Sequence, residues 1–314
     1  AIGAGRKYIK ENKVDAIITT GPPHSAHLVG IELQKEFKLP WIADFRDPWT
    51  TVYYNAFFNR GKRAEAKDKA LEDKVLRSAD HTVVISHGMQ EEFMDRTKAS
   101  SVIPNGYDEA DMYRGPAEQN THFRLCYIGN MKPNQHVPAL WEAAAELIKS
   151  NADFARDFRF HFTGILDPSI TNAFEILGIS DAITTQGFVA HKEATKQMFQ
   201  AGMLLFVIPD SVDNHKIVTG KVFEYIASGT SIFAVGPVKG NASKILEQAN
   251  APRMIDYAEK EEMKIRLINA YQVWLDGDKF PLKAENANYL RFSRNALTGD
   301  LAAILDKLAS LVSN

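Results

Sequence analysis

The sequence predicts an α/β protein with two doubly wound parallel sheets, and three observations carry this prediction. Short apolar runs alternate with helical patterns along the 314 residues, and such alternation is typical of parallel sheets covered by helices on both faces. An Asn-Gly turn at 105–106 and a polar stretch at 114–122 break the alternation once. The length also corresponds to two domains of roughly 150 residues each.

The first half of the chain predicts an incomplete sheet. Strands are expected at 15–19, 41–43, 81–85 and 102–103, and helices at 6–13, 25–37, 64–77 and 89–95. The pattern starts on a helix with no strand before it, although such a helix normally follows a strand in a βαβ crossover. The chain also does not begin with Met. We therefore expect a first domain, residues 1–113, that lacks its N-terminal part.

The second half predicts a complete doubly wound domain at residues 114–292. Strands are expected at 124–128, 158–162, 183–186, 203–207 and 231–235, and helices at 138–149, 170–177, 192–200, 221–227 and 242–249. Residues 293–314 are expected to form a C-terminal helix that crosses back to the first domain.

Composition excludes several functional classes. Hydrophobic residues make up 45% and charged residues 24%, as in an ordinary globular protein. The net charge of −2 lacks the positive field of a dedicated nucleic-acid binder, so no nucleic-acid partner is expected. The single cysteine, Cys126, cannot form an internal disulfide or a multi-thiolate metal site. No apolar run is long enough to cross a bilayer and no signal-peptide pattern is present, so we expect a cytoplasmic protein.

Ligands of open α/β sheets bind beyond the carboxyl ends of the strands, so the strand-to-helix loops are the candidate sites. The first such loop places His24 and Ser25 at the start of a helix, where an ordinary polar helix start is an equally good interpretation. His24 and His27 are three residues apart, but no third ligand is nearby, which disfavours a metal site.

The second loop places Asp44, Arg46 and Asp47 directly after an apolar strand, where ionisable groups are costly to bury. A structural Arg–Asp pair is the alternative to a functional role. The aromatic residues that follow stand beside a basic helix, and this combination is typical of docking on an anionic membrane or a lipid-linked acceptor. A solvated helix face is the other interpretation, because acidic residues interleave with the bases. The aromatic residues are Trp49, Tyr53, Tyr54, Phe57 and Phe58.

The strongest candidate site is the stretch from Thr219 to Gly229. Thr219 and Gly220 stand where a helix is expected to begin, and the free N–H groups of a helix start favour anions. Lys221 adds a positive charge, and Glu224, one turn later, is placed to accept hydrogen bonds from vicinal hydroxyls such as those of a ribose. The alternative is an ordinary helix start with Thr219 as the N-cap.

At these residues the chain resembles the family 4 glycosyltransferases of the GT-B fold. GPPHSAH and IADFRDPW within 15–49 resemble the family's first domain, and VIPNGYD at 102–108 resembles its interdomain segment. TGKVFEYIASG at 219–229 resembles its nucleotide-sugar site. The resemblance implies two Rossmann-like domains facing a cleft, with the acceptor bound by the first and the donor mainly by the second. It also implies that about three βα units, roughly 90 residues, precede this chain.

The resemblance assigns roles to individual residues. Glu224 holds the nucleotide ribose, and the three residues 219–221 meet the diphosphate. Two positions depart from the family pattern. Lys216 stands where the family has the first glutamate of its paired motif, and residues 129–136 lack the basic positions of its Gly-Arg…Lys-Gly pattern. The diphosphate is therefore expected to be stabilised by Lys132, Lys216 or Lys221.

The resemblance thus implies a retaining glycosyltransferase that moves a sugar from a nucleotide-sugar donor to a saccharide or lipid-linked acceptor, in cell-surface polysaccharide synthesis. Neither a cofactor nor a metal is expected. The expected catalytic residues are Arg46, Asp47 and Lys221; the donor side has Gly129, Lys132, Lys216, Thr219, Gly220 and Glu224; the acceptor side has His24, Ser25 and Asp44. The first domain is expected to contact the inner membrane surface.

Three alternatives remain open. A nucleotide-sugar epimerase shares the architecture, but the sequence shows no clear acid and base residues for epimerisation. A bilobal sugar-binding protein also has two α/β domains, although the nucleotide signature at 219–224 counts against it. A chain that lacks part of its acceptor domain would bind the donor without transferring the sugar.

Overall fold

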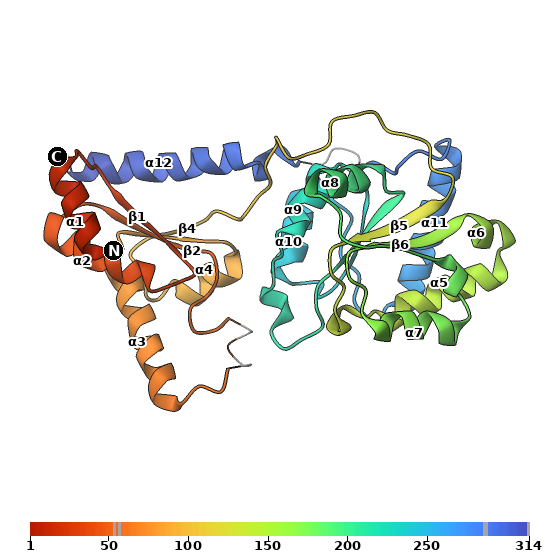
Figure 1. Cartoon of the computed structure of the whole chain (residues 1–314), viewed down its shortest axis with the longest axis horizontal. Coiled ribbons are helices and arrows are strands. Elements are labelled where there is room, and N and C mark those ends of the chain that lie inside the picture. The colour runs from red at the N-terminus through yellow and green to blue at the C-terminus, as the bar shows by residue number, and fades with distance from the viewer. Residues whose placement is uncertain (53–54, 56–57, 285–287, 313–314) are drawn as a thin grey trace. The chain divides into compact units, whose positions relative to one another are not determined.

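The computed structural model describes residues 1–52, 55, 58–284 and 288–312. The chain divides into two compact units (Figure 1). Unit 1 contains residues 1–105 and 294–314, and unit 2 contains residues 106–293. The two units are described separately.

Unit 1 is built on a sheet of four parallel strands in the order β1-β2-β3-β4. The strands are β1 (Ile17–Gly21), β2 (Trp41–Phe45), β3 (His81–Val84) and β4 (Ser100–Val102). The helices are α1 (Ile2–Glu11), α2 (Ala26–Phe37), α3 (Lys62–Ser78), α4 (His87–Phe93) and α12 (Arg294–Val312).

The two faces of the unit 1 sheet are covered by different helices, because successive side chains of a strand point to opposite faces. Trp41 and Phe45 of β2 are fully buried in one cluster with residues of α2, α3 and α4. Gly30 of α2 makes this packing possible, since a Cβ there would run into the Trp41 indole. Ile42 points to the other face and packs with Leu297 of α12. The C-terminal helix therefore completes the core of unit 1.

Unit 2 is built on a sheet of five parallel strands in the order β7-β6-β5-β8-β9. The strands are β5 (Phe123–Ile128), β6 (Phe158–Thr163), β7 (Ile183–Gln186), β8 (Met203–Val207) and β9 (Ile232–Val235). The helices are α5 (Pro138–Ser150), α6 (Ala152–Asp157), α7 (Pro168–Leu177), α8 (His191–Gln200), α9 (Lys221–Ala227), α10 (Asn241–Gln248) and α11 (Lys260–Asp276). Short 3-10 helices lie at Pro133–Gln135, Ser180–Ala182, Asn214–Lys216 and Leu290–Phe292.

The unit 2 core has two layers, one on each face of the sheet. Trp141 of α5 and Trp274 of α11 are fully buried in the first layer, with aromatic side chains of β5 and β6. Phe223 of α9 and Leu246 of α10 are fully buried in the second, with β8 and β9. Strand order reverses between β5 and β8, so their carboxyl ends form the switch point at which doubly wound sheets bind ligands.

The predicted fold class is confirmed: the protein is α/β, with two parallel sheets. Every run predicted as a strand forms one, and its bounds move by at most two residues. Two helices were not predicted, α6 and α11. In the described part of the chain, no helix combines the length and the apolar character needed to cross a membrane.

Candidate functional site

Two tightly packed loops follow β5 and β6, and the loop after β5 borders the switch point of unit 2. Gly129 follows β5, and its N–H donates to the carbonyl of Thr163 at the end of β6, at 2.7 Å. Gly129 and Gly164 have φ values of +122° and +111°, a region that L side chains rarely adopt. A Cβ on Gly164 would also lie 2.7 Å from the carbonyl oxygen of Gly129. Both positions therefore need glycine, which brings backbone rather than side chains to this edge of the sheet.

Lys221 lies directly beside this backbone. It is the first residue of α9, and its Nζ is 3.0 Å from the position that a Cβ on Gly129 would occupy. The same Nζ lies over the Tyr127 ring, 3.7 Å from the ring centre. Burial lowers the pKa of Lys221 to about 7, and the negative charge of Glu224 only partly opposes this effect. An ammonium group that is largely removed from water and lies against backbone favours the binding of an anion.

Glu224 lies one turn further along α9 and has a partner that sequence reasoning missed. Its Oε1 is 3.0 Å from Nε2 of His191, the first residue of α8. The Glu224 side chain retains 31% of its exposure, so the carboxylate stays accessible to hydroxyl groups of a ligand. The position of His191 at a helix start after β7 was the only signal in the sequence.

The other predicted donor-side residues differ in their surroundings. Thr219 does not cap α9: the N-cap is Gly220, and the buried Thr219 Oγ1 has no hydrogen-bond partner among the described residues. The alternative interpretation of Thr219 as an N-cap is therefore wrong. A Cβ on Gly220 would meet open space. Lys132 and Lys216 are exposed, and the Nζ of Lys216 lies 3.9 Å from Oδ2 of Asp213. Of the three candidate lysines, only Lys221 lies against the glycine loops.

In unit 1, Arg46 is held by hydrogen bonds at the end of β2. Its Nη2 lies 2.7 Å from Asp44 Oδ1, and its Nη1 donates to the carbonyls of Ile103 and Pro104 at 3.1 and 3.4 Å. Asp44 also accepts a hydrogen bond from Thr20 at 2.8 Å. The structural Arg–Asp pair, one of the two predicted interpretations, is therefore formed. Asp47 is the next residue of the same loop.

His24 belongs to a stack of rings beside that loop. Its ring centre is 5.3 Å from Trp49 and 6.0 Å from His27, in both cases with the rings nearly parallel. His24 Nδ1 and His27 Nε2 are buried without a hydrogen-bond partner among the described residues, and each lies within 3 Å of the point that a Cβ on Gly21 would occupy. Burial lowers the pKa of His24, and lowers the pKa of His27 to about 4. Ser25 is exposed at the start of α2.

The described residues contain no cluster of three or more metal-ligating side chains. The aromatic loop predicted for membrane contact is described only in part, since Tyr53, Tyr54 and Phe57 lie outside the described residues. Phe58 is 60% exposed, whereas Trp49 packs against the core of unit 1.

A pocket of about 750 Å³ opens at the opposite edge of the unit 1 sheet, where Leu39 and Pro40 precede β2. Its lining includes Lys35, Lys38 and Lys74 but none of the predicted site residues. The candidate site therefore rests on side-chain chemistry at the carboxyl ends of the strands and not on this pocket.

Comparison with known proteins gives a family match for the first part of the chain and structural matches over nearly all of it. Residues 1–111 match the family model described as Glycosyltransferase Family 4. Sucrose-phosphate synthase from Thermosynechococcus elongatus matches with a TM-score of 0.62 and 16% identity, over 99% of this chain and 77% of that chain. A mutant of S. aureus TarM, in complex with Fondaparinux, alpha-GlcNAc-glycerol and UDP, matches with a TM-score of 0.61 and 12% identity, over 97% of this chain and 58% of that one.

A third match is the lipopolysaccharide outer core galactosyltransferase WaaB, with a TM-score of 0.58 and 15% identity, over 98% of this chain and 79% of that chain. No curated protein sequence matches the chain. The chain thus spans 58% of the length of TarM and more than three quarters of the other two. Residues 1–111 are thus similar to Glycosyltransferase Family 4, and the two parallel sheets have the GT-B fold of the matched structures.

Proposed function

We propose that this protein is a glycosyltransferase, which moves a sugar from a nucleotide-sugar donor to a hydroxyl of a saccharide or lipid-linked acceptor with retention of anomeric configuration. The observation that carries the proposal is the place of Lys221. Its Nζ lies against the glycine loop after β5, at the switch point of the sheet, with Glu224 one turn away. The Lys221 ammonium beside the Gly129 backbone suits a diphosphate. The Glu224 carboxylate, which can accept hydrogen bonds from hydroxyl groups, suits the ribose joined to it.

The geometry of unit 2 suggests how the donor is activated. Glu224 accepts hydrogen bonds from the ribose hydroxyls, and His191 orients its carboxylate. Lys221 stabilises the negative charge that grows on the leaving diphosphate, which makes it the group most directly involved in the reaction. We propose that this ammonium supplies the positive charge for the step without a metal or other cofactor.

The chemical step is proposed as a transfer on one face of the sugar. The bond between the anomeric carbon and the diphosphate oxygen breaks, and the acceptor oxygen bonds to the anomeric carbon from the same face. The acceptor proton passes to an oxygen of the leaving diphosphate. Unit 1 binds the acceptor through the carboxylate of Asp47, in the loop after β2 that Arg46 and Asp44 fix, and through His24 and Ser25 on the neighbouring loop.

The acceptor class is proposed from the sequence and from the matched proteins. TarM was solved with UDP and alpha-GlcNAc-glycerol, and WaaB is named for the lipopolysaccharide outer core. UDP-sugars are therefore the first donors to test. A cell-surface saccharide or its lipid-linked precursor is the acceptor we propose, reached at the cytoplasmic face of the inner membrane through unit 1.

The test starts from donor binding, which needs no acceptor. Ligand binding to the native state raises the melting temperature, so a panel of UDP-, GDP- and ADP-sugars identifies the donor. Lys221→Ala and Glu224→Ala are expected to lower turnover about 100- to 1000-fold, the typical effect of removing one aimed group. Lys149→Ala and Glu175→Ala, at exposed positions of unit 2, are the matched controls. Wild-type donor affinity and turnover in both site variants would refute the site.

The same assays separate the alternatives. An epimerase converts the nucleotide sugar without any acceptor, so an epimerised product in the absence of acceptor would replace transfer as the function. A sugar-binding protein responds to free sugar alone. Donor binding without transfer to any acceptor would support the third alternative, that part of the acceptor side precedes this chain.

A further inference from the structure

We propose that Glu72 and Arg96 are positioning residues, which fix the loop carrying Asp47 and Trp49 and so set the rate of transfer to the acceptor. The inference rests on the proposed function, because it treats this loop as part of the acceptor side. Nothing in the sequence suggested it: the two residues are 24 positions apart, on α3 and just after α4.

Glu72 is a fully buried carboxylate with four donors. Its Oε2 accepts from the backbone N–H and the hydroxyl of Thr50, at 3.0 and 2.9 Å. Its Oε1 accepts from Lys69 Nζ at 3.0 Å and from Arg96 Nη1 at 2.7 Å. Burial would raise the pKa of Glu72, but the hydrogen bonds from Arg96, Lys69 and Thr50 outweigh it and lower the pKa. Glu72 Oε2 thus accepts two hydrogen bonds, both from the loop residue Thr50.

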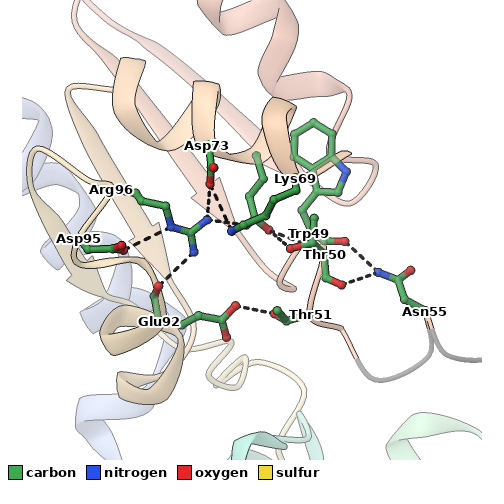
Figure 2. A network of polar contacts seen from close by, with 10 residues as sticks. Trp49, Thr50, Thr51, Asn55, Lys69, Asp73, Glu92, Asp95 and Arg96 are labelled. Carbon is green, nitrogen blue, oxygen red and sulfur yellow. Dashed lines mark hydrogen bonds and ion pairs between the residues drawn. The ribbon is translucent and has the colours of Figure 1, made fainter. Parts of the chain in front are cut away.

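Arg96 connects this carboxylate to a second anchor of the same loop (Figure 2). The Arg96 side chain is 8% exposed. Its Nη1 lies 2.6 Å from Asp73 Oδ1, and its Nη2 donates to the carbonyl of Glu92 at 3.1 Å. The Glu92 carboxylate in turn accepts from the hydroxyl of Thr51 at 2.6 Å. Two consecutive loop residues are therefore each bound by a carboxylate, and the guanidinium of Arg96 contacts both carboxylate-bearing residues.

The anchored loop residues adjoin the acceptor-side side chains. Trp49 precedes Thr50 and its ring lies 5.3 Å from that of His24. The amide of Asn55 donates to the carbonyls of Trp49 and Thr50, both at 3.1 Å, which closes the loop on itself (Figure 2). Asp47 is three residues before Thr50. A shift of the Thr50 anchor would therefore displace the Trp49–His24 stack and Asp47 together.

A role in stability alone explains this arrangement poorly. Replacing a buried ion pair by apolar residues of similar volume is often neutral or stabilising, so the pair is weak evidence for stability. An apolar pair would, however, leave the N–H and hydroxyl of Thr50 without their acceptor, so its cost would fall on the loop. The charged network holds Thr50 in a single position through two hydrogen bonds. An apolar pair has no acceptor and cannot do this.

The test compares three variants in the full chain. Thr50→Val removes one donor, Glu72→Gln removes the charge, and the double variant Glu72→Met with Arg96→Met replaces the pair by apolar side chains. The matched control is Asp157→Asn, because Asp157 is a buried carboxylate of unit 2 that is bonded to Arg156 and Tyr271. This control loses a comparable buried interaction away from both candidate sites.

Two readouts are measured on each variant. The first is amide hydrogen exchange of the segment 47–52, which reports local opening without any substrate. The second is transfer from the donor that the thermal-shift panel identifies to a panel of methyl and octyl glycosides, with UDP affinity measured separately. We expect the double variant to exchange at least tenfold faster at 47–52 and to transfer about 100-fold more slowly, as expected for a misplaced group. Its UDP affinity stays within twofold of the wild type, and Asp157→Asn changes neither exchange at 47–52 nor transfer.

The outcomes are distinguishable from failure of the proposed function. If the wild type binds no nucleotide and transfers no sugar, the proposed function is wrong, and the exchange rates of 47–52 alone then decide whether Glu72 and Arg96 hold the loop. Wild-type exchange in the double variant would overturn the inference. Faster exchange with unchanged transfer would overturn it as well, because the loop would then move without consequence.

Discussion

The Nζ of Lys221 lies 3.7 Å from the centre of the Tyr127 ring and pairs with no carboxylate oxygen among the described residues. The ring face attracts a cation, but it compensates only part of the hydration that the ammonium has lost. The protein therefore carries a cation whose charge is costly until an anion arrives. This cost bears on both ligand binding and stability.

Binding of a nucleoside diphosphate is expected to take up a proton. The pKa of Lys221 is about 7 in the free protein, and an adjacent diphosphate raises it because it favours the charged form. UDP affinity should therefore fall as the pH rises above 7, by up to tenfold per pH unit, and level off below 7. Titration calorimetry in buffers of different ionisation enthalpy measures the proton uptake directly. A pH-independent affinity between 7 and 9, or no difference between wild type and Lys221→Met, would contradict the prediction.

Lys221→Met is expected to stabilise unit 2 while it abolishes tight nucleotide binding. The folded pKa of Lys221 lies below its ordinary value of 10.5, so the unfolded chain binds more protons between pH 7 and 10.5. The wild type therefore loses stability as the pH falls from 10.5 to 7, and the variant does not. The gain should be visible in thermal unfolding at pH 7, at roughly 2–4 °C per kcal/mol, and should vanish above pH 10.5. Equal melting temperatures at pH 7 would show that the ammonium is not desolvated.

Glu224 is expected to discriminate between nucleotides with and without ribose hydroxyls. In the wild type UDP should bind about 10- to 100-fold more tightly than 2′,3′-dideoxy-UDP, because hydrogen bonds to a charged acceptor contribute about 1.5–3 kcal/mol. Glu224→Ala should weaken UDP binding and remove the difference between the two nucleotides.

His191→Ala tests the orientation of that carboxylate, since its Nε2 is the group bonded to Glu224 Oε1. It should reduce the discrimination less than Glu224→Ala does. Equal discrimination in the wild type and in Glu224→Ala would remove Glu224 from the ribose site.

Two glycines of unit 2 are expected to respond differently to alanine. Gly164→Ala forces a side chain onto a φ of +111° and a Cβ to within 2.7 Å of the Gly129 carbonyl oxygen, so it should lower stability by about 1–3 kcal/mol. Gly220→Ala meets no heavy atom within 4 Å, so the free protein should melt as the wild type does. Any loss of UDP affinity in Gly220→Ala then measures how closely the ligand approaches this position. A melting temperature for Gly220→Ala as low as that for Gly164→Ala would contradict the loop geometry.

Unit 1 is expected to lose stability in mild acid through His27. Its pKa is about 4 in the folded protein, chiefly because the ring is buried, and 6.5 is its ordinary value. The unfolded chain therefore binds an extra proton between pH 6.5 and 4, and about 3 kcal/mol of stability is lost across that window. His27→Asn should flatten the pH dependence of unit 1 unfolding there, although it lowers stability at pH 7. An unchanged acid profile in the variant would assign the loss to other groups.

The strands were predictable because each is an apolar run between polar turns, and the parallel arrangement followed from the alternation with helices. The stretch 219–229 could also be singled out as a candidate site, since GKVFEYIASG places a cation and a carboxylate one turn apart. α11 was missed although Met263, Leu267, Tyr271 and Trp274 repeat at helical spacing and are buried. The signal for this helix was therefore present in the sequence.

The partners of the site residues could not have been predicted. His191 meets Glu224 across 33 residues because α8 and α9 lie side by side, and the Tyr127 ring reaches Lys221 because β5 ends beneath α9. Composition and spacing contain no information on such contacts. The same holds for the network of Glu72: the charge pattern favours a solvated helix face, and this is wrong for Glu72, which is fully buried. For Arg46 the sequence left a structural and a functional interpretation open, and the hydrogen bonds to Asp44 and to residues 103–105 form the structural one.

The return of α12 to unit 1 makes unit 2 an insertion in the chain. Unit 2 is one continuous stretch, and its two ends are neighbours, since Tyr107 N–H donates to the carbonyl of Phe292 at 3.1 Å. Both points at which the backbone leaves unit 1 therefore lie side by side. Cutting there removes the five-stranded sheet as a single segment and breaks no strand of either sheet. Another α/β module could be joined between the same two points, and under the proposed function such an exchange would change the donor while unit 1 stays intact.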